Sequence, residues 1–276
     1  MTQVMETDTV TERNTLVDYD AKDGVAILTL TDPPANTYTY EMMTQLDRAI
    51  LTARMDNSVE VILLTGAGEK FFCAGADINM LNEAEPNFKY YFCLHANETL
   101  NRLEHTRKLT IAALNGHTVG GGLEIAMAAD LRVARKGAGK IGLPEVNLGV
   151  LPGTGGTQRL CRLVGKSLAI ELMASGDVVA FEDVDNKNLV NQVMEADSHE
   201  DFMNQVMEYA ARFTTPNKAA KAVGHIKRAV QTGIGLPFEQ ALALERELQQ
   251  QLFQSADARE GISAYVEKRK PEFSGS

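Results

Sequence analysis

The order of apolar and polar positions along the chain predicts strands and helices in alternation over the first two-thirds of the sequence. Nearly continuous apolar runs, typical of buried strands, occupy residues 25–31, 59–65, 109–114 and 131–134. Apolar residues spaced three or four apart, typical of amphipathic helices, occupy residues 40–54 and 92–106. This alternation predicts an α/β fold.

The pattern changes after about residue 195, where helical spacing replaces strand-like runs. Apolar residues then recur on helical faces, at Ala220, Val223, Ile226 and Val230, and again at Phe238, Ala241, Leu248 and Leu252. Helices that come last in the chain and have wide apolar faces pack either on a core of their own or on another subunit. We therefore predict a polar N-terminal tail over residues 1–14, a core over 15–200, and a helical region for oligomerisation over 201–276.

Composition narrows the class of protein. The chain has 276 residues, of which 44% are hydrophobic, so it can bury a sizeable core. Its formal net charge of −10 argues against binding of nucleic acid or an anionic membrane. Three widely spaced cysteines form neither a disulfide framework nor a zinc motif. With no run long enough to cross a bilayer and no targeting segment, we expect a cytoplasmic protein.

The most informative segment is rich in glycine and contains two glutamates. Gly120, Gly121 and Gly122 are followed by helix-forming residues, which predicts that the glycines begin a helix. Free N–H groups and the helix dipole favour a developing negative charge there. Glu124 lies one turn further along, and Glu145 follows a second tight segment. Such a layout is typical of an enzyme that stabilises an oxyanion while it moves protons.

Several other chemistries are excluded by spacing. Gly165-Lys166-Ser167 ends like a phosphate-binding loop, but the required first glycine is Leu160. The glycines at 153–156 lack the spacing of a dinucleotide-binding fingerprint. No serine stands in the glycine cluster, and no His, Cys and Asp residues have metal-ligand spacing. His117 could be catalytic, but a histidine satisfied by the backbone is the favoured interpretation.

Four motifs in order resemble those of the crotonase (enoyl-CoA hydratase/isomerase) superfamily. They are Phe72-Cys-Ala-Gly-Ala-Asp77, Asn115-Gly116 with Gly120-Gly-Gly-Leu-Glu124, Pro144-Glu145, and Pro152-Gly-Thr-Gly-Gly-Thr-Gln-Arg-Leu160. The match extends through Gly165-Lys-Ser167 to Ala256-Asp-Ala-Arg-Glu-Gly261 and Tyr265-Val-Glu-Lys268. It therefore covers roughly residues 15–272.

The resemblance implies a spiral of ββα units followed by a helical trimerisation region, usually assembled as a dimer of trimers. It also implies acyl-CoA thioester substrates, with coenzyme A carried by the substrate and no further cofactor or metal. By position, the N–H groups of Ala76 and Gly121 correspond to the family's oxyanion hole, and the backbone of Gly153 to a position beside the reacting water. The implied CoA-binding positions are Ala35, Ala74, Ala76, Asp77, Ile78, Tyr265 and Lys268.

The two glutamates favour a 2-enoyl-CoA hydratase within this superfamily. Hydration places OH on Cβ and H on Cα, so it needs a water held by two carboxyl groups. We assign Glu145 as the proton donor to Cα and Glu124 as the group that activates water. The alternatives are an acyl-CoA isomerase or C–C hydrolase of the same fold, or a non-catalytic acyl-CoA-binding or RNA-associated relative.

The remaining residues receive structural interpretations. We expect Asp77 and Asp130 to act as caps or hydrogen-bond partners, Cys73 to pack, and Phe71 and Phe72 to lie in the core. Residues 81–93 are expected to line the acyl pocket. Proline at position 121 should delete the oxyanion donor and still permit the helix.

The chain departs from the family pattern in three places. It is one residue longer between Asp130 and Glu145, through residues 136–140, which could alter the access route. Asn79 replaces a lysine that often contacts CoA phosphate, and residues 32–36 lack a basic residue often present there.

Overall fold

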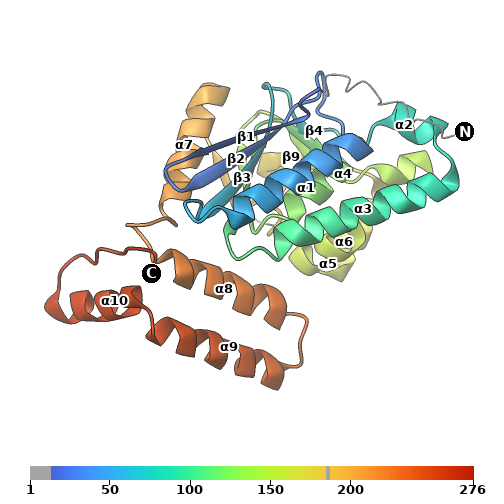
Figure 1. Ribbon diagram of the computed structural model, residues 1–276. Helices are drawn as coiled ribbons and strands as arrows, with labels where there is room; N and C mark the ends of the chain where they lie inside the picture. Colours follow the sequence, from blue (N-terminus) through green and yellow to red (C-terminus); the bar gives the residue numbers. More distant parts are fainter. Residues whose placement is uncertain (1–13, 185–186) are drawn as a thin grey trace, which may run out of the picture.

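Two sheets organise the computed structural model, which describes residues 14–184 and 187–276 (Figure 1). The larger sheet has six strands in the order β1-β2-β3-β5-β7-β10, and the smaller has four in the order β4-β6-β8-β9. β1 and β9 pair antiparallel with their neighbours, and all other pairs are parallel. The strands of the larger sheet are β1 (Val17–Lys22), β2 (Val25–Leu30), β3 (Val61–Gly66), β5 (Leu109–Leu114), β7 (Leu131–Arg135) and β10 (Gln192–Met194). Those of the smaller sheet are β4 (Phe71–Cys73), β6 (His117–Val119), β8 (Lys140–Gly142) and β9 (Val178–Ala180).

The chain visits the two sheets in turn. Each of β3, β5 and β7 is followed directly by a strand of the smaller sheet, and then by helical structure. The helical segments of this part are α1 (Tyr40–Met55), α2 (Ile78–Glu83), α3 (Pro86–Glu104), α4 (Gly121–Met127), η1 (Glu145–Leu148), α5 (Gly156–Val164), α6 (Lys166–Ser175), η2 (Phe181–Val184) and α7 (His199–Ala211). This repetition is the ββα spiral that the resemblance implied, and it confirms the α/β fold class.

Helices cover both faces of the larger sheet, so its central strands are buried. α1 and α3 lie over one face and α7 over the other (Figure 1). α7 presents Phe202, Val206 and Ala210 to the sheet, all fully buried. β3 is buried along its whole length, which explains the continuous apolar run at residues 61–64.

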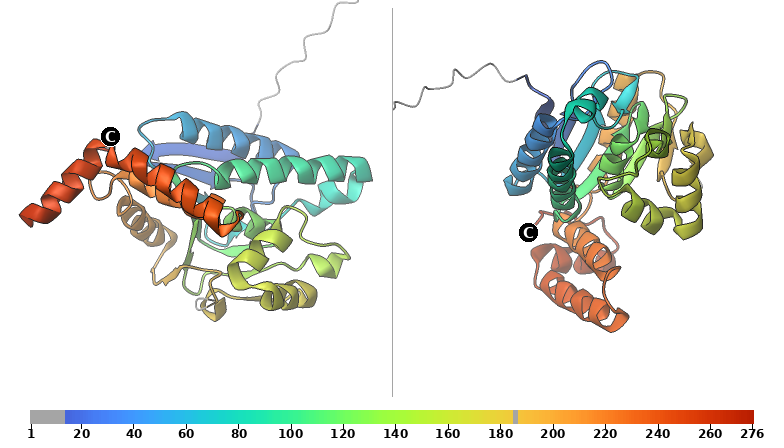
Figure 2. Two further views of the ribbon diagram at one scale, coloured as in Figure 1. Left: turned by 90° about the horizontal axis from the view of Figure 1, so that it is seen from below. Right: turned by 90° about the vertical axis from the view of Figure 1, so that its right-hand side faces the viewer.

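The last three helices stand apart from the sheets. α8 (Ala220–Gly233), α9 (Phe238–Phe253) and α10 (Ala256–Glu267) form a separate layer, seen in both further views (Figure 2). α7, which the sequence pattern placed at the start of this region, packs on the sheet instead. Ile226 and Val230 of α8 remain 63% and 65% exposed, so this layer leaves an apolar face uncovered in the single chain.

Two parts of the pattern were not readable from the sequence. α3 begins at Pro86, six residues before the predicted start, because exposed Phe88, Tyr90 and Tyr91 obscure its amphipathic spacing. The strands of the smaller sheet have three residues each, too few for an alternation to be recognised. In the described ranges, no helix is both long and apolar enough to cross a membrane.

Candidate active site

Two backbone N–H groups without partners lie close together where the chain passes from β4 to α2 and from β6 to α4. An isolated parallel bridge pairs Tyr38 with Ala76, through Tyr38 N to Gly75 O (2.9 Å) and Asp77 N to Tyr38 O (3.0 Å). This pattern leaves the Ala76 N–H unused, and Gly121 is the first residue of α4, where N–H groups have no helical acceptor. Among the described residues, neither N–H donates a hydrogen bond.

Glycine permits the close backbone approach that pairs these donors. A Cβ on Gly75 would lie 3.2 Å from the Gly121 nitrogen, and a Cβ on Gly122 would lie 2.0 Å from the Cys73 carbonyl oxygen. Gly75 has φ +93° and Gly120 has φ +56°, both in the region that favours glycine. The glycine cluster therefore begins a helix, as predicted, and also seats it against the segment 73–76.

Position 121 is more constrained than the sequence suggested. A Cβ there would lie 2.3 Å from the Tyr38 hydroxyl and 2.4 Å from the Tyr38 ring. Proline carries a Cβ, so it would force Tyr38 or α4 to move. The expectation that proline at this position preserves the structure is wrong for this packing reason.

Glu124 lies in α4 and is almost completely buried, with 2% of its surface exposed. Its Oε1 accepts from the N–H groups of Thr154 (2.8 Å) and Gly156 (2.6 Å), which belong to the second glycine-rich segment. Burial raises the pKa of this carboxyl, while those two N–H groups, the Thr154 hydroxyl and the charge of Arg159 act to lower it. The backbone therefore holds one carboxylate oxygen in a fixed position.

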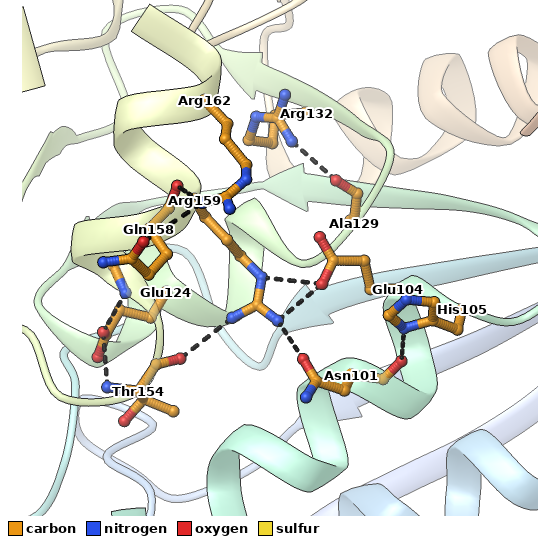
Figure 3. A network of polar contacts seen from close by, with 11 residues as sticks. Asn101, Glu104, His105, Glu124, Ala129, Arg132, Thr154, Gln158, Arg159 and Arg162 are labelled. Carbon is orange, nitrogen blue, oxygen red and sulfur yellow. Dashed lines mark hydrogen bonds and ion pairs between the residues drawn. The ribbon is translucent and has the colours of Figure 1, made fainter. Parts of the chain in front are cut away.

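A polar network behind this segment anchors it to α3 (Figure 3). The Arg159 guanidinium donates to Glu104 Oε2 (2.8 Å), Asn101 Oδ1 (2.9 Å) and the Thr154 carbonyl (3.2 Å). Arg159 and Glu104 form a mostly buried ion pair, with 9% and 19% of their side chains exposed. α3 and α5 thus hold Thr154, which in turn holds Glu124.

Glu145 opens η1 and lies close to the helix-starting glycines. Its Oε1 is 3.2 Å from the position that a Cβ on Gly120 would occupy. Its Oε2 is buried and has no hydrogen-bond partner within residues 14–184 and 187–276. Burial, with a smaller contribution from the charge of Glu124, raises the pKa of Glu145 to about 7. The two carboxyl groups are therefore electrostatically coupled neighbours with different surroundings.

Gly153 lies beside the same site. Its carbonyl accepts from the Asn97 amide of α3 (3.2 Å), and a Cβ on it would lie 3.4 Å from Cys93 Sγ. The structure thus brings Ala76, Gly121, Glu124, Glu145 and Gly153 into one region. Their individual roles stay predictions.

The expected CoA-binding positions divide into two groups. Ala74 N donates to Ala35 O (3.0 Å), and Ala76, Asp77 and Ile78 follow directly along the chain, so these five residues lie together beside the two unpartnered N–H groups. Tyr265 and Lys268 lie in and directly after α10, in the separate helical layer on the far side of the molecule from α2 (Figures 1 and 2). One chain does not bring them to its own site.

The residues given structural interpretations behave as predicted, with one exception. Asp77 caps α2 by accepting from Met80 N (2.6 Å), and Asp130 accepts from Thr110 and pairs with Lys227. Cys73 and Phe72 are fully buried, while Phe71 is only partly buried. His117 Nδ1 accepts from the backbone N–H of Lys140 (3.1 Å), so a backbone contact satisfies it. Residues 136–139 form the turn between β7 and β8, and Lys140 begins β8; the Gly137 N–H donates to Glu182 Oε1 in this turn.

Sequence reasoning missed three residues of the site. Thr154 and Arg159 stand in the recognised motif, but the sequence does not show that one holds Glu124 and the other holds Thr154. Tyr38 forms an isolated bridge and belongs to no strand or helix, so it carries no periodic signal. Within the described part of the chain, no three His, Cys, Asp or Glu side chains are grouped to hold a metal ion.

Comparison with known proteins gives consistent matches. The family model described as Enoyl-CoA hydratase/isomerase matches residues 20–276. The short-chain-enoyl-CoA hydratase of Clostridium acetobutylicum is 37% identical, over 94% of this chain and 97% of the relative. The crotonyl-CoA hydratase of Syntrophomonas wolfei is 34% identical, over 92% and 95%. The crystal structure of an enoyl-CoA hydratase from Geobacillus kaustophilus is 42% identical, with a TM-score of 0.91 over 96% of this chain and 98% of that one.

Proposed function

The chain belongs to the enoyl-CoA hydratase/isomerase family, and on this premise we propose that it adds water across the 2,3 double bond of 2-enoyl-CoA thioesters. The observation that carries the proposal is the placing of two differently tuned carboxyl groups beside two unpartnered N–H groups. Glu124 is held by backbone donors, and Glu145 has a pKa raised to about 7. Hydration needs one group that accepts a proton and one that donates it.

Each step of the addition has a group suited to it. The thioester oxygen accepts from the N–H groups of Ala76 and Gly121, which stabilise the enolate that forms. Glu124 takes a proton from water as the oxygen bonds to Cβ, and Glu145 gives a proton to Cα. The net result is addition of H and OH, with both carboxyl groups restored by proton exchange. CoA belongs to the substrate, and no step draws on another cofactor.

Short-chain enoyl thioesters are the substrates that we propose. Two relatives that cover nearly the whole chain are named for short-chain and crotonyl substrates. The acyl chain of the bound substrate would extend from the site along α3, where Cys93 lies beside Gly153. Residues 81–93 stay the predicted lining of that pocket.

The functional unit that we propose is a homo-oligomer, a trimer or a dimer of trimers. Support comes from the uncovered apolar face of α8 and from the groove of about 610 Å³ beside it, between α8 and the end of α4. Tyr265 and Lys268 would then complete the CoA site of a neighbouring copy. Val230→Glu should lower the mass measured by light scattering, whereas Lys221→Glu, at an exposed polar position of the same helix, should not.

An absorbance assay tests the proposed activity. Loss of the conjugated enoyl thioester should be observed with crotonyl-CoA and should weaken along a series of longer enoyl chains. Isomerisation of a 3-enoyl thioester, measured in parallel, distinguishes the alternative within the family. A folded protein that hydrates none of the series would contradict the proposal.

A further inference from the structure

A buried phenol lies beside the site, at a position that the proposed reaction does not use. Tyr38 is 2% exposed, and its ring stacks on Phe92 of α3 with centroids 5.6 Å apart. Its other side lies against Gly121, where a Cβ would meet the hydroxyl at 2.3 Å. A buried hydroxyl is costly unless it is hydrogen-bonded. The Tyr38 hydroxyl lies 3.1 Å from Thr154 Oγ1, so it has that partner.

Thr154 is the residue through which Tyr38 reaches Glu124. The Thr154 N–H donates to Glu124 Oε1 (2.8 Å), and its carbonyl accepts from Arg159 (3.2 Å). The backbone of Thr154 is thus held on both sides, which fixes the position of its side chain. The whole residue is only 3% exposed, so water does not compete for its hydroxyl.

Tyr38 and Thr154 share one hydrogen bond between their hydroxyls, in which either oxygen can donate. Because Thr154 also binds Glu124 through its N–H, this hydrogen bond links the position of the Tyr38 ring to the position of the carboxyl. Burial, followed by the charge of Glu124, raises the pKa of Tyr38 well above its ordinary value, so the phenol keeps its proton.

Few other titratable groups face the hydrogen-bonded side chains of Tyr38, Thr154 and Glu124. Arg159 is paired with Glu104, and burial raises the pKa values of the Cys73 and Cys93 thiols, which favours their neutral form. Glu145 has a pKa raised to about 7, so it changes charge near neutral pH. The groups that face Glu124 or Tyr38 are therefore Glu145 of η1, Arg159 of α5, Cys93 of α3 and Cys73 of β4.

We propose that Tyr38 is a positioning residue for hydration: its hydrogen bond to the Thr154 hydroxyl seats Thr154 so that the Thr154 N–H holds Glu124 Oε1 and favours the carboxylate that accepts a proton from water. The inference rests on the proposed function, because it assigns Glu124 the role of base. It predicts that removing either hydroxyl raises the pH at which Glu124 becomes ionised. Glu145 is affected by these hydroxyls only through its coupling to Glu124, so its titration should change less.

The pH dependence of kcat/KM with crotonyl-CoA tests this inference. In Tyr38→Phe, which keeps the ring, the acidic limb should move to higher pH by about half to one unit. This shift corresponds to the free energy of about one neutral hydrogen bond. Thr154→Val should move it at least as far, and Thr154→Ser, which restores a hydroxyl, should return it. The alkaline limb should move less than the acidic limb in all three variants.

Two comparisons separate positioning from general destabilisation. Tyr19→Phe removes another buried phenolic oxygen, one without a partner in the described part of the chain, and should leave both limbs unchanged. In the double variant Tyr38→Phe/Thr154→Val, the shift should equal that of Thr154→Val alone, because Tyr38 acts through Thr154.

Three results would overturn the inference while wild-type hydration stands. One is an unshifted acidic limb in Tyr38→Phe, and another is a further shift in the double variant. The third is failure of Thr154→Ser to restore the profile. If Tyr38→Phe does not fold, the Thr154 pair decides alone. Absence of hydration in the wild-type protein would instead contradict the proposed function.

Discussion

At the scale of single residues, two chemically identical side chains lie in different surroundings. Glu124 receives two main-chain donors that favour its charged form, whereas Glu145 has an oxygen with no partner in the described residues and a pKa raised to about 7. A carboxyl that titrates near neutral pH can donate a proton and regain it at little cost. The structure therefore supports a division of labour that the sequence proposed only through the family resemblance.

The pH dependence of kcat/KM should be bell-shaped. Glu145 must be protonated to act as the acid, so activity should fall as pH rises through about 7, the raised pKa of its carboxyl. Glu124 must be ionised to act as the base, so activity should also fall at acidic pH. Because the two carboxyl groups are coupled, the apparent pKa values of the acidic and alkaline limbs belong to the pair and not to either residue alone. A rate that keeps rising well above neutral pH would exclude Glu145 as the proton donor.

Substitution of each glutamate should separate hydration from isomerisation. Glutamine keeps the shape but neither gives nor accepts the proton, so Glu124→Gln and Glu145→Gln should each slow hydration by about 10²–10⁴. The double variant should lose far less than the product of the two effects, since the groups act as a unit. Isomerisation of a 3-enoyl thioester should depend mainly on Glu145. Wild-type hydration in Glu124→Gln would favour an isomerase.

The residues that sequence reasoning found are those whose type and spacing are unusual. Glycine clusters with carboxyl groups beside them indicate their chemistry directly, so the sequence alone was enough to single out Gly121, Glu124 and Glu145. Tyr38 was not found, because its contact with Thr154 joins residues 116 positions apart. Proline at position 121 looked harmless for a similar reason, since nothing in the sequence places the Tyr38 ring against that glycine.

At the scale of elements, one buried ion pair connects the C-terminal helices to the sheet. Lys227 of α8 is 2.8 Å from Asp130 Oδ2 and also donates to the Lys108 carbonyl (3.0 Å). Gly224, one turn earlier, lies against the Arg107 carbonyl, which a Cβ would meet at 2.5 Å. Polar contacts therefore hold α8 against the segment that leads into β5. The helix lies so close to this segment that position 224 has no space for a side chain.

Breaking this pair should loosen α8 and destabilise the protein. Lys227→Met leaves Asp130 partly buried without its cation, a change that typically costs about 3–5 kcal/mol. Urea unfolding should show this loss, and hydrogen exchange should show α8 opening first. Lys221→Met alters an exposed lysine of the same helix and serves as the control. Equal stability of the two variants would mean that the pair does not anchor α8.

Long elements were predictable and short ones were not. The runs that became β3 and β5 and the spacing that became α1 each extend over six or more residues, enough for a period to be visible. The whole smaller sheet consists of three-residue strands and was missed. β1 was missed because it exposes most of its residues to solvent.

At the scale of the whole molecule, the positions predicted to bind CoA do not meet within the described chain. The five predicted N-terminal positions lie beside the two unpartnered N–H groups, while Tyr265 is 87% exposed in a distant helix. The sequence pattern predicted helices with uncovered faces, and the structure shows them. The sequence pattern does not identify what covers these faces, because the spacing of apolar residues describes one face of a helix and not its partner.

Lys268 gives a test of the proposed assembly. If its ammonium reaches the CoA of a neighbouring copy, Lys268→Ala should raise KM for the CoA ester and leave kcat nearly unchanged. The effect should be larger at low salt, where charge interactions are less screened. Lys270→Ala, at an exposed lysine nearby, is the matched control. A normal KM with normal salt dependence would remove Lys268 from the site.

The donors at Ala76 and Gly121, and those that hold Glu124, are all main-chain N–H groups. Mutation exchanges side chains and, proline apart, leaves every main-chain donor in place. If the first two donors stabilise a thioester oxygen as proposed, descendants of such a chain inherit that function even when both glutamates are replaced. Divergence toward other acyl-CoA reactions then needs changes at a few side-chain positions, because the part that is hardest to rebuild is carried by the path of the backbone itself.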